Sequence, residues 1–186
     1  MDWQSKFTAA TDYRCFLDTY GKPGQPQRWR AVYEQLTLTD EQRALLLGFT
    51  RRMNVLCLAG VWCGDCVNQC PILQRIAEAT DRIELRFLDR DEHMDVQREL
   101  SINGGHRVPM VVFLSEDYHE CGRYGDRTLS KYRQLTQTLQ GAACPTGTAA
   151  SEDTLLKLAT AEWLAEFERV QLMLRLSPRL REKYRD

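Results

Sequence analysis

The sequence lacks a long hydrophobic run, and its amino terminus has no basic segment followed by an uninterrupted apolar one. These absences argue against a membrane-spanning helix and against a secretion signal. Neither sign of charge dominates, because 25 basic and 26 acidic residues leave a formal net charge of -1. That balance argues against a nucleic-acid or membrane partner. We therefore expect a soluble, cytoplasmic protein.

Histidine is also scarce, and its three residues show no paired-His or Cys/His/acid order typical of a zinc site or a hydrolase. Cysteine is plentiful, but seven is an odd number, so complete pairing within the chain is excluded. A reducing compartment that keeps most thiols free fits this count. We expect no metal ion. Cys15, Cys57 and Cys121 are predicted to be buried free thiols, and His93 and His119 surface residues.

The first 52 residues are predicted to form a helical extension. One helix is expected over residues 2–20, where large apolar side chains recur near helical spacing. A second begins at Pro26, which suits the first turn of a helix. A third follows Thr39, because Gln42 three residues later completes a capping box.

From residue 54 the pattern changes to alternating strands and helices. Strands are predicted at 54–59, 83–88, 108–114 and 120–124, and helices at 64–80, 91–100 and 128–140. This order is typical of an α/β domain, which we place at residues 53–140. The last two strands follow each other closely and are expected to form an antiparallel hairpin that closes a mixed sheet.

The last unit predicted, residues 141–186, combines a linker with a helix. Residues 141–150 are mostly small and include glycine and proline, which interrupt regular secondary structure. Ser151 is placed to cap the long helix that follows. Its apolar stripe must be buried against the main domain or a partner chain, so a homodimer through this helix is one option. Pro178 is expected to end the helix, and 179–186 to form a solvated tail. The stripe comprises Leu155, Ala159, Trp163, Phe167, Val170 and Leu174.

Two cysteines separated by two residues stand where the strand at 54–59 gives way to the helix at 64–80. Cys63 and Cys66 therefore lie at the start of that helix. Unpaired backbone amides and a partial positive charge at a helix N-terminus favour a thiolate. A CxxC pair in this setting is typical of a thiol–disulfide redox site.

With this order of elements, residues of about 53–140 resemble the thioredoxin family. Trp62 precedes the pair, Pro71 stands five residues after Cys66 where the family kinks its long helix, and Val108-Pro109 stands where the family has its cis-proline. The resemblance implies a three-layer α/β sandwich, with a central mixed sheet flanked by helices. The extra N- and C-terminal helices lie outside the resemblance.

The resemblance implies a thiol–disulfide oxidoreductase, which we expect to act as a disulfide reductase. Cys63 would attack a substrate disulfide and Cys66 would resolve the mixed disulfide, so the Cys63–Cys66 disulfide itself serves in place of a cofactor. The expected substrates are proteins or small molecules that contain disulfides. A reductase or dithiol donor is the expected second partner, because the spent pair must be reduced again.

The residues around the pair receive roles from the same resemblance. Gly64 belongs to the motif, and Trp62 is expected to be a flat substrate platform. A cis peptide before Pro109 would expose the Val108 backbone to an extended substrate. His106 and Arg107, just before it, either add positive charge near Cys63 or are solvated loop residues.

Three features depart from the family pattern or extend it. Asp65 replaces the proline of the family's CGPC motif, and Cys57 stands where the family has a buried aspartate. Asp65 either disfavours the thiolate, which makes a stronger reductant, or is only a solvated acid of the first helical turn. Cys70 shares a helix face with Cys63 and Cys66, so it is either a third redox thiol or a buried free cysteine.

Two other classes of function remain open at this level. The chain could be a non-catalytic thioredoxin-like module that senses redox state or docks a protein partner through its helical extensions. The third class is a metal or cluster protein, since Cys63, Cys66 and Cys70 resemble part of a ferredoxin run. That run lacks its leading cysteine, and a rigid helix cannot wrap a cluster as a loop does.

Overall fold

A computed structural model describes residues 1–140 and 152–185 of the chain. The predicted linker, the predicted cap Ser151 and Cys144 lie outside the described residues. Within the described ranges, none of the helices combines the length and the apolar character needed to cross a membrane.

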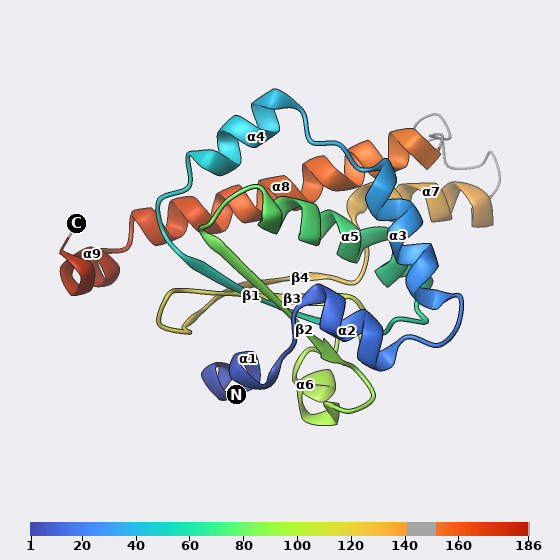
Figure 1. The fold of residues 1–186 in the computed structure, drawn as a ribbon, viewed down its shortest axis with the longest axis horizontal. Helices are drawn as coiled ribbons and strands as arrows, with labels where there is room; N and C mark the ends of the chain where they lie inside the picture. The colour runs from blue at the N-terminus through green and yellow to red at the C-terminus, as the bar shows by residue number, and fades with distance from the viewer. Residues whose placement is uncertain (141–151, 186) are drawn as a thin grey trace.

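Helices stand at both ends of the chain, and strands and helices alternate between them (Figure 1). The elements are, in order, α1 (Trp3–Ala9), α2 (Tyr13–Tyr20), α3 (Gln25–Gln35), α4 (Asp40–Leu47), β1 (Met53–Ala59), α5 (Gly64–Glu78), β2 (Ile83–Asp89), α6 (Met94–Glu99), β3 (Met110–Leu114), β4 (Glu120–Gly125), α7 (Leu129–Gln140), α8 (Glu152–Arg175) and α9 (Pro178–Tyr184).

The four strands form one mixed sheet in the order β2-β1-β3-β4. β1 pairs with β2 in parallel and with β3 in antiparallel fashion, and β3 and β4 form the predicted hairpin. Every residue of β1 is buried, because this inner strand is covered on both faces. A continuous apolar run is the sequence signature of such a strand.

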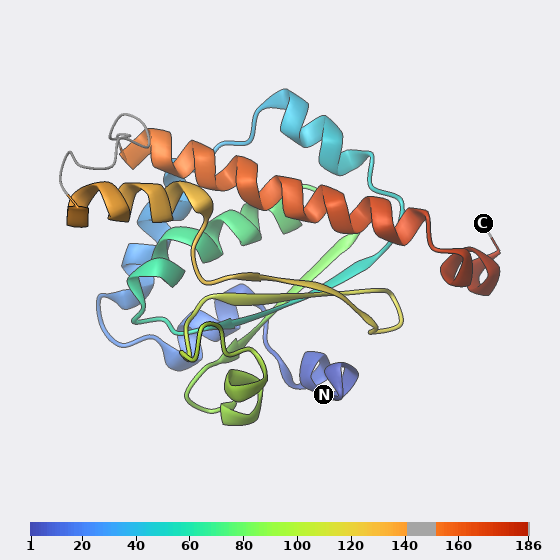
Figure 2. The ribbon, with the colours of Figure 1, turned by 180° about the vertical axis from the view of Figure 1, so that it is seen from behind.

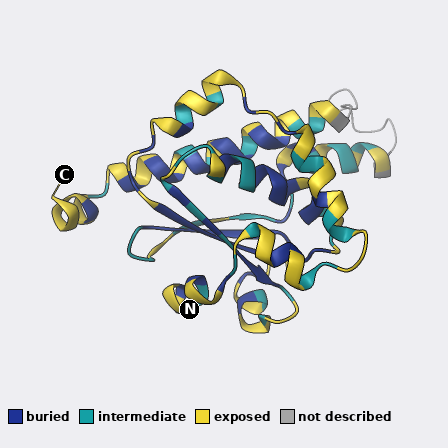
Figure 3. Ribbon diagram, in the orientation of Figure 1, coloured by how far each residue is buried: buried dark blue, intermediate teal, exposed yellow. Residues whose placement is uncertain are grey.

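Helices cover both faces of the sheet, so the predicted three-layer α/β sandwich is confirmed. On one face, α5 and α8 run across the strands, while α1 and α6 lie on the opposite face (Figures 1 and 2). Phe113 of β3 meets Phe167 of α8 edge-on at 5.1 Å between ring centroids. Figure 3 shows the buried residues gathered in the sheet and on the sides of α5 and α8 that face it.

An aromatic cluster attaches α2 and α3 to the same face of β2 that α5 covers. Phe16 and Trp29 are fully buried and pack against Phe87 of β2. The Trp29 indole Nε1–H donates a hydrogen bond of 2.9 Å to the Val61 carbonyl. This bond ties α3 to the loop that precedes the cysteine pair.

The predicted helix over residues 2–20 is wrong, because the chain forms two helices there. The Asp12 carboxylate accepts from the Cys15 amide at 2.8 Å and caps α2. Thr11 leaves the helical path to exchange backbone hydrogen bonds of 3.0 and 2.7 Å with Phe87. Cys15 is exposed, not buried, because it lies on the outward side of α2. The capping box of Thr39 and Gln42 at α4 is confirmed.

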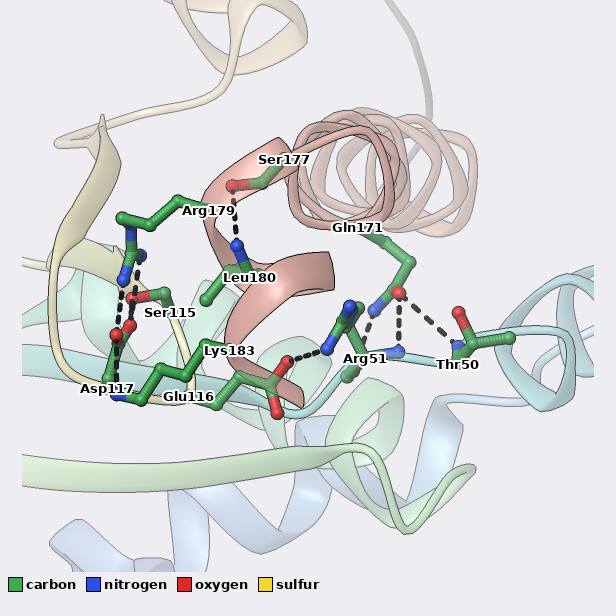
Figure 4. Close-up of polar contacts among 10 residues, drawn as sticks. All are labelled: Thr50, Arg51, Ser115, Glu116, Asp117, Gln171, Ser177, Arg179, Leu180 and Lys183. Atoms are coloured by element: carbon green, nitrogen blue, oxygen red, sulfur yellow. Dashed lines mark hydrogen bonds and ion pairs between the residues drawn. The ribbon is translucent and has the colours of Figure 1, made fainter. Parts of the chain in front are cut away.

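The apolar stripe of α8 is buried within the chain itself. Trp163, Phe167 and Val170 have no exposed surface. Farther along α8, the Gln171 side chain bonds to the backbone of residues 50 and 51 on the segment that leads into β1 (Figure 4). The helix is therefore fixed to the sheet by both apolar and polar contacts.

The prediction of a solvated tail after Pro178 is wrong, since these residues form α9. Pro178 occupies the first turn of the new helix, and Ser177 caps it. Leu180 is 1% exposed. Arg179 and Lys183 both reach Asp117 in the turn between β3 and β4, and the Lys183 Nζ lies 2.9 Å from its carboxylate (Figure 4).

Asp117 is therefore predicted to stabilise the docking of α9 in a pH-dependent way. The hydrogen bond from Arg179, together with those from Ser115 and Lys183, holds the pKa of Asp117 well below its ordinary value. Its contribution is present above a pH of about 4 and is lost as the pH falls toward the folded-state pKa. Asp117→Asn should lower the free energy of unfolding at neutral pH by about 1 kcal/mol.

Thermal unfolding as a function of pH measures this effect. The difference between wild type and Asp117→Asn should shrink below a pH of about 4. Asp153→Asn is the matched control, because its pair with Lys157 is largely exposed, at 74% and 75%. A pH-independent difference would contradict the ionic role of Asp117.

Candidate active site

The cysteine pair stands at the turn from β1 into α5. Cys63 is the N-cap residue of α5, with extended backbone angles, and its amide donates to the Gly60 carbonyl at 3.0 Å. Its own carbonyl accepts the first bond of the helix, from Val67 at 2.9 Å. The helix begins at Gly64, where space around the backbone is open. The unpaired amides of Asp65 and Cys66 in the first turn of α5 favour the ionised form of the Cys63 sulfur.

The two sulfurs differ in accessibility. Cys63 is half-buried, whereas Cys66, one helical turn farther on, has no exposed surface. Both are free thiols. A molecule in solution can reach Cys63 but not Cys66.

Ionisation of the pair is shared between the two thiols. Their mutual hydrogen bond is the largest influence on Cys63, and with burial it raises the pKa of that thiol. Burial opposes ionisation of Cys66 as well, but the neighbouring thiols of Cys63 and Cys70 lower its pKa. Since the pair titrates as a unit, it loses its first proton below the ordinary thiol value and its second well above it. One negative charge is thus held between two sulfurs.

The Val108 carbonyl lies beside the accessible sulfur. The Cys63 thiol donates to it at 3.5 Å, and the Val108–Pro109 peptide bond is cis. β3 begins directly afterwards, at Met110. Gly125 of β4 packs against this segment with a φ of 151°, and a Cβ there would lie 2.3 Å from the Pro109 carbonyl oxygen. Only glycine fits this close approach.

Trp62 forms an exposed wall next to the pair. Its side chain is 45% exposed, and the Arg90 guanidinium lies 4.7 Å from the ring centroid. Gly60 allows this placement, because a Cβ there would come within 2.9 Å of the ring. The backbone carbonyl of His106 accepts from Arg90 at 3.3 Å, which joins the loop before Pro109 to the same wall.

The charged residues of the site are neutralised in pairs. The Arg127 Nε and a terminal nitrogen both lie 2.9 Å from Oδ2 of Asp65, so this acid is not merely solvated. Arg107 pairs with Asp126 at 3.3 Å. Asp126 is 2% exposed and also accepts from the Tyr132 hydroxyl. The positive charge of Arg107 is thus directed at a carboxylate.

A buried glutamine joins the helix of the pair to distant parts of the chain. Gln69 Nε2 donates to the Asp126 carbonyl at 2.8 Å, and its Oε1 accepts from the Trp163 indole at 3.1 Å. Gln69 therefore links α5 both to α8 and to the loop after β4. Sequence reasoning did not find Gln69, Asp126 or Arg127, which belong to no motif. The one available signal was a polar residue on the apolar side of a predicted helix.

Two further thiols lie behind the pair. Cys57 and Cys70 have no exposed surface, and their sulfurs are 3.9 Å apart. Burial is the largest cause that raises the pKa of each. A substrate in solution cannot reach Cys70 directly. In the described ranges, no three His, Cys, Asp or Glu side chains are arranged to hold a metal ion.

A cavity of about 220 Å³ opens beside Asp65, between α3, α5, α7 and α8. Gln35, Asn68 and Lys131 contribute polar groups to its wall. Neither Cys63 nor Cys66 lines it, so the cavity is not the place where the thiols would react.

The sheet order, the helices on both faces and the pair at the start of α5 define a thioredoxin-like α/β protein. The thioredoxin family model matches residues 11–138, and the chain belongs to that family. The match begins at residue 11, between α1 and α2, and so includes most of the predicted N-terminal extension. The predicted domain boundaries at 52 and 140 stay predictions. None of the curated proteins matches the chain significantly.

Two solved structures share the fold across most of the chain. A protein of unknown function from Pseudomonas aeruginosa has a TM-score of 0.68 and 17% identity, over 90% of this chain and 98% of that one. An HIV epitope scaffold has a TM-score of 0.67 and 18% identity, over 90% of this chain and 99% of that one. Identities this low show the fold alone.

Asp65 and Arg127 are predicted to shift the ionisation of the cysteine pair in opposite directions. The negative charge of Asp65 is one of the influences that raise the pKa of Cys66. Asp65→Asn should therefore lower the pH at which the cysteine pair first ionises. Arg127→Gln should raise it, because Asp65 loses its counter-charge. Each shift should stay below about one pH unit, since the pair is partly exposed.

Thiolate absorbance during a pH titration measures both shifts. The double variant should return close to wild type, because neither charge is then present. Equal shifts in the same direction from the two single variants would contradict this assignment.

Proposed function

We propose that this protein is a thiol–disulfide oxidoreductase that acts as a disulfide reductase. The observation that carries the proposal is one accessible sulfur, Cys63, at a helix N-terminus, with a second sulfur, Cys66, buried one turn behind it. The accessible thiol can meet a substrate, whereas the buried one is reached only from within the protein and lies one helical turn from Cys63. A two-step disulfide exchange requires one thiol that attacks the substrate and a second that resolves the mixed disulfide.

The first step is attack by the Cys63 thiolate on one sulfur of a substrate disulfide. The new bond joins Cys63 Sγ to that sulfur, and the other substrate sulfur leaves as a thiolate that takes up a proton. The backbone amides of Asp65 and Cys66 favour negative charge on Cys63, against the opposing effects of the Cys66 thiol and of burial. A mixed disulfide between protein and substrate results.

In the second step, the Cys66 thiolate attacks Cys63 Sγ. The bond between Cys63 and the substrate breaks, and the second substrate sulfur leaves as a thiol after protonation. Two electrons have then passed from the protein to the substrate, and Cys63 and Cys66 form a disulfide. No bound cofactor takes part, and a reductase or dithiol donor restores the pair.

The surroundings of Cys63 favour an extended substrate. The Val108 carbonyl next to the sulfur can accept from a substrate amide, and Trp62 offers a flat apolar wall. Disulfide-containing proteins or small disulfides are the proposed substrates. A reducing compartment, such as the cytoplasm, suits this reaction.

The charges of the site favour a reductase over an oxidant. A strong oxidant needs a strongly stabilised thiolate in its reduced form. Arg107 and Arg127 do not supply that stabilisation, because each is paired with a carboxylate, Asp126 or Asp65.

Substitution of the two cysteines tests the proposal. Cys63→Ser should reduce turnover of a model disulfide to the background rate, at least about 100-fold below wild type. Cys66→Ser should accumulate a mixed disulfide, because the resolving thiol is missing. Reduction of the model disulfide and mass spectrometry of the trapped adduct are the measurements. Cys121→Ser, a half-buried cysteine outside the pair, is the matched control and should behave as wild type.

The same variants separate the enzyme from a non-catalytic binding or redox-sensing module. Disulfide capture of several clients by Cys66→Ser supports the enzyme. Retention of one partner by a variant that lacks both cysteines, with turnover unchanged in Cys63→Ser, would overturn it in favour of the module.

A further inference from the structure

The sulfur of Cys66 must bear negative charge at a place that water does not reach. It attacks as a thiolate in the resolving step proposed above, yet its residue has no exposed surface. A buried anion without donors is costly, so hydrogen bonds inside the protein must replace those of water.

The thiols of Cys57 and Cys70 lie directly behind this sulfur. Cys57 is on β1 and Cys70 on α5, and their sulfurs are 3.9 Å apart. Cys70 stands one helical turn after Cys66 on α5, so the two fully buried thiols lie on the same side of the helix, and each influences the ionisation of the other. The Cys57 thiol has a second acceptor, the Leu58 carbonyl at 3.9 Å. The three sulfurs thus form a chain that leads inward from the reactive pair.

We propose that Cys70, supported by Cys57, is a positioning residue that donates a hydrogen bond to the Cys66 thiolate during the resolving step. This inference rests on the proposed function, since it assigns a role within the same exchange. Cys70 neither touches the substrate nor changes its own redox state.

Each of the two buried thiols has a choice of acceptor. While Cys66 is protonated, Cys57 can donate to the Leu58 carbonyl and Cys70 can donate to Cys57. When Cys66 becomes a thiolate, rotation about two Cβ–Sγ bonds turns the Cys70 proton toward Cys66 and the Cys57 proton toward Cys70. No proton or electron leaves its sulfur. Donors already in place need little reorganisation when the charge appears.

Other groups also influence the ionisation of Cys66. Burial and the charge of Asp65 disfavour the thiolate, whereas Cys63 and the Gly60 backbone amide favour it. Tyr13 of α2 faces Cys70, and burial followed by the proximity of Cys70 raises the pKa of its phenol, which stays neutral. Its hydroxyl is buried without a hydrogen-bond partner, so it does not bond to the thiols.

The resolving step can be observed by itself after rapid mixing of the full chain with a small aromatic disulfide. Release of the first aromatic thiol reports attack by Cys63, and release of the second reports attack by Cys66. Cys70→Ala should move the midpoint of the second step's pH profile up by about one unit, which slows the step about tenfold at any pH well below the wild-type midpoint. Cys70→Ser should keep the wild-type midpoint or lower it, because a hydroxyl also donates.

Three comparisons make the test specific. The first step should change less than the second in every variant, since Cys57 and Cys70 lie next to Cys66 and not next to Cys63. Cys57→Ala should shift the second step in the same direction as Cys70→Ala but less. Cys15→Ser is the control, because that cysteine is exposed on α2. A wild-type midpoint in both Cys70→Ala and Cys57→Ala would overturn the proposal.

Equal shifts in Cys70→Ala and Cys70→Ser would also overturn it, because they would reflect packing and not hydrogen-bond donation. If Cys70→Ala does not fold, the comparison of Cys57→Ala with Cys57→Ser decides by the same criterion. Failure of the proposed function is a different result, since wild type would then release no aromatic thiol in either step.

Discussion

The burial of Cys66 directly beneath the half-buried Cys63 is the constraint on which the rest of the structure depends. It requires α5 to start at the edge of the sheet and then run across its face, so that one turn of helix leads from the surface to the core. β1 provides the fixed end of this arrangement, because it is buried throughout and paired on both sides. The difference in accessibility between the two thiols is therefore a property of the fold and not of the motif alone.

Segments far from the pair hold this turn in place. Trp29 of α3 bonds to the carbonyl of Val61, just before the motif. Gln69 joins α5 to Trp163 of α8 and to the loop at Asp126. The helices at both ends of the chain thus contribute to the scaffold of the site. The family match begins at residue 11 and therefore includes α2, α3 and α4 of the N-terminal helices. Substitutions in α3 or α8 can disturb the thiols without touching them.

Electrostatic neutrality around an ionisable pair is a second consequence of the packing. Asp65 and Asp126 each meet an arginine, so neither the acid inside the motif nor the loop arginines act as isolated charges. The ionisation of Cys66 is governed mainly by its burial, by the neighbouring thiols and by the Gly60 amide, and less by the charge of Asp65. In a buried site, hydrogen bonds of this kind determine which sulfur carries the charge more than distant ions do. The six cysteines of the described residues also differ in burial, from the exposed Cys15 to the fully buried Cys66.

By itself, the sequence determined the alternation of strands and helices, the mixed sheet and the position of Cys63 at a helix start, because periodicity and capping are local signals. It also indicated the capping box at Thr39, but it missed the break at Thr11, where pairing with Phe87 overrides helical spacing. It missed α9 as well, since a buried Leu180 and the ion pairs with Asp117 are tertiary contacts. The partners of Asp65 and Cys70 were decided only by the tertiary structure, because Arg127 and Cys57 reach them from other strands and loops. Contacts between residues distant in sequence leave no periodic trace, and those contacts set the charge of the site.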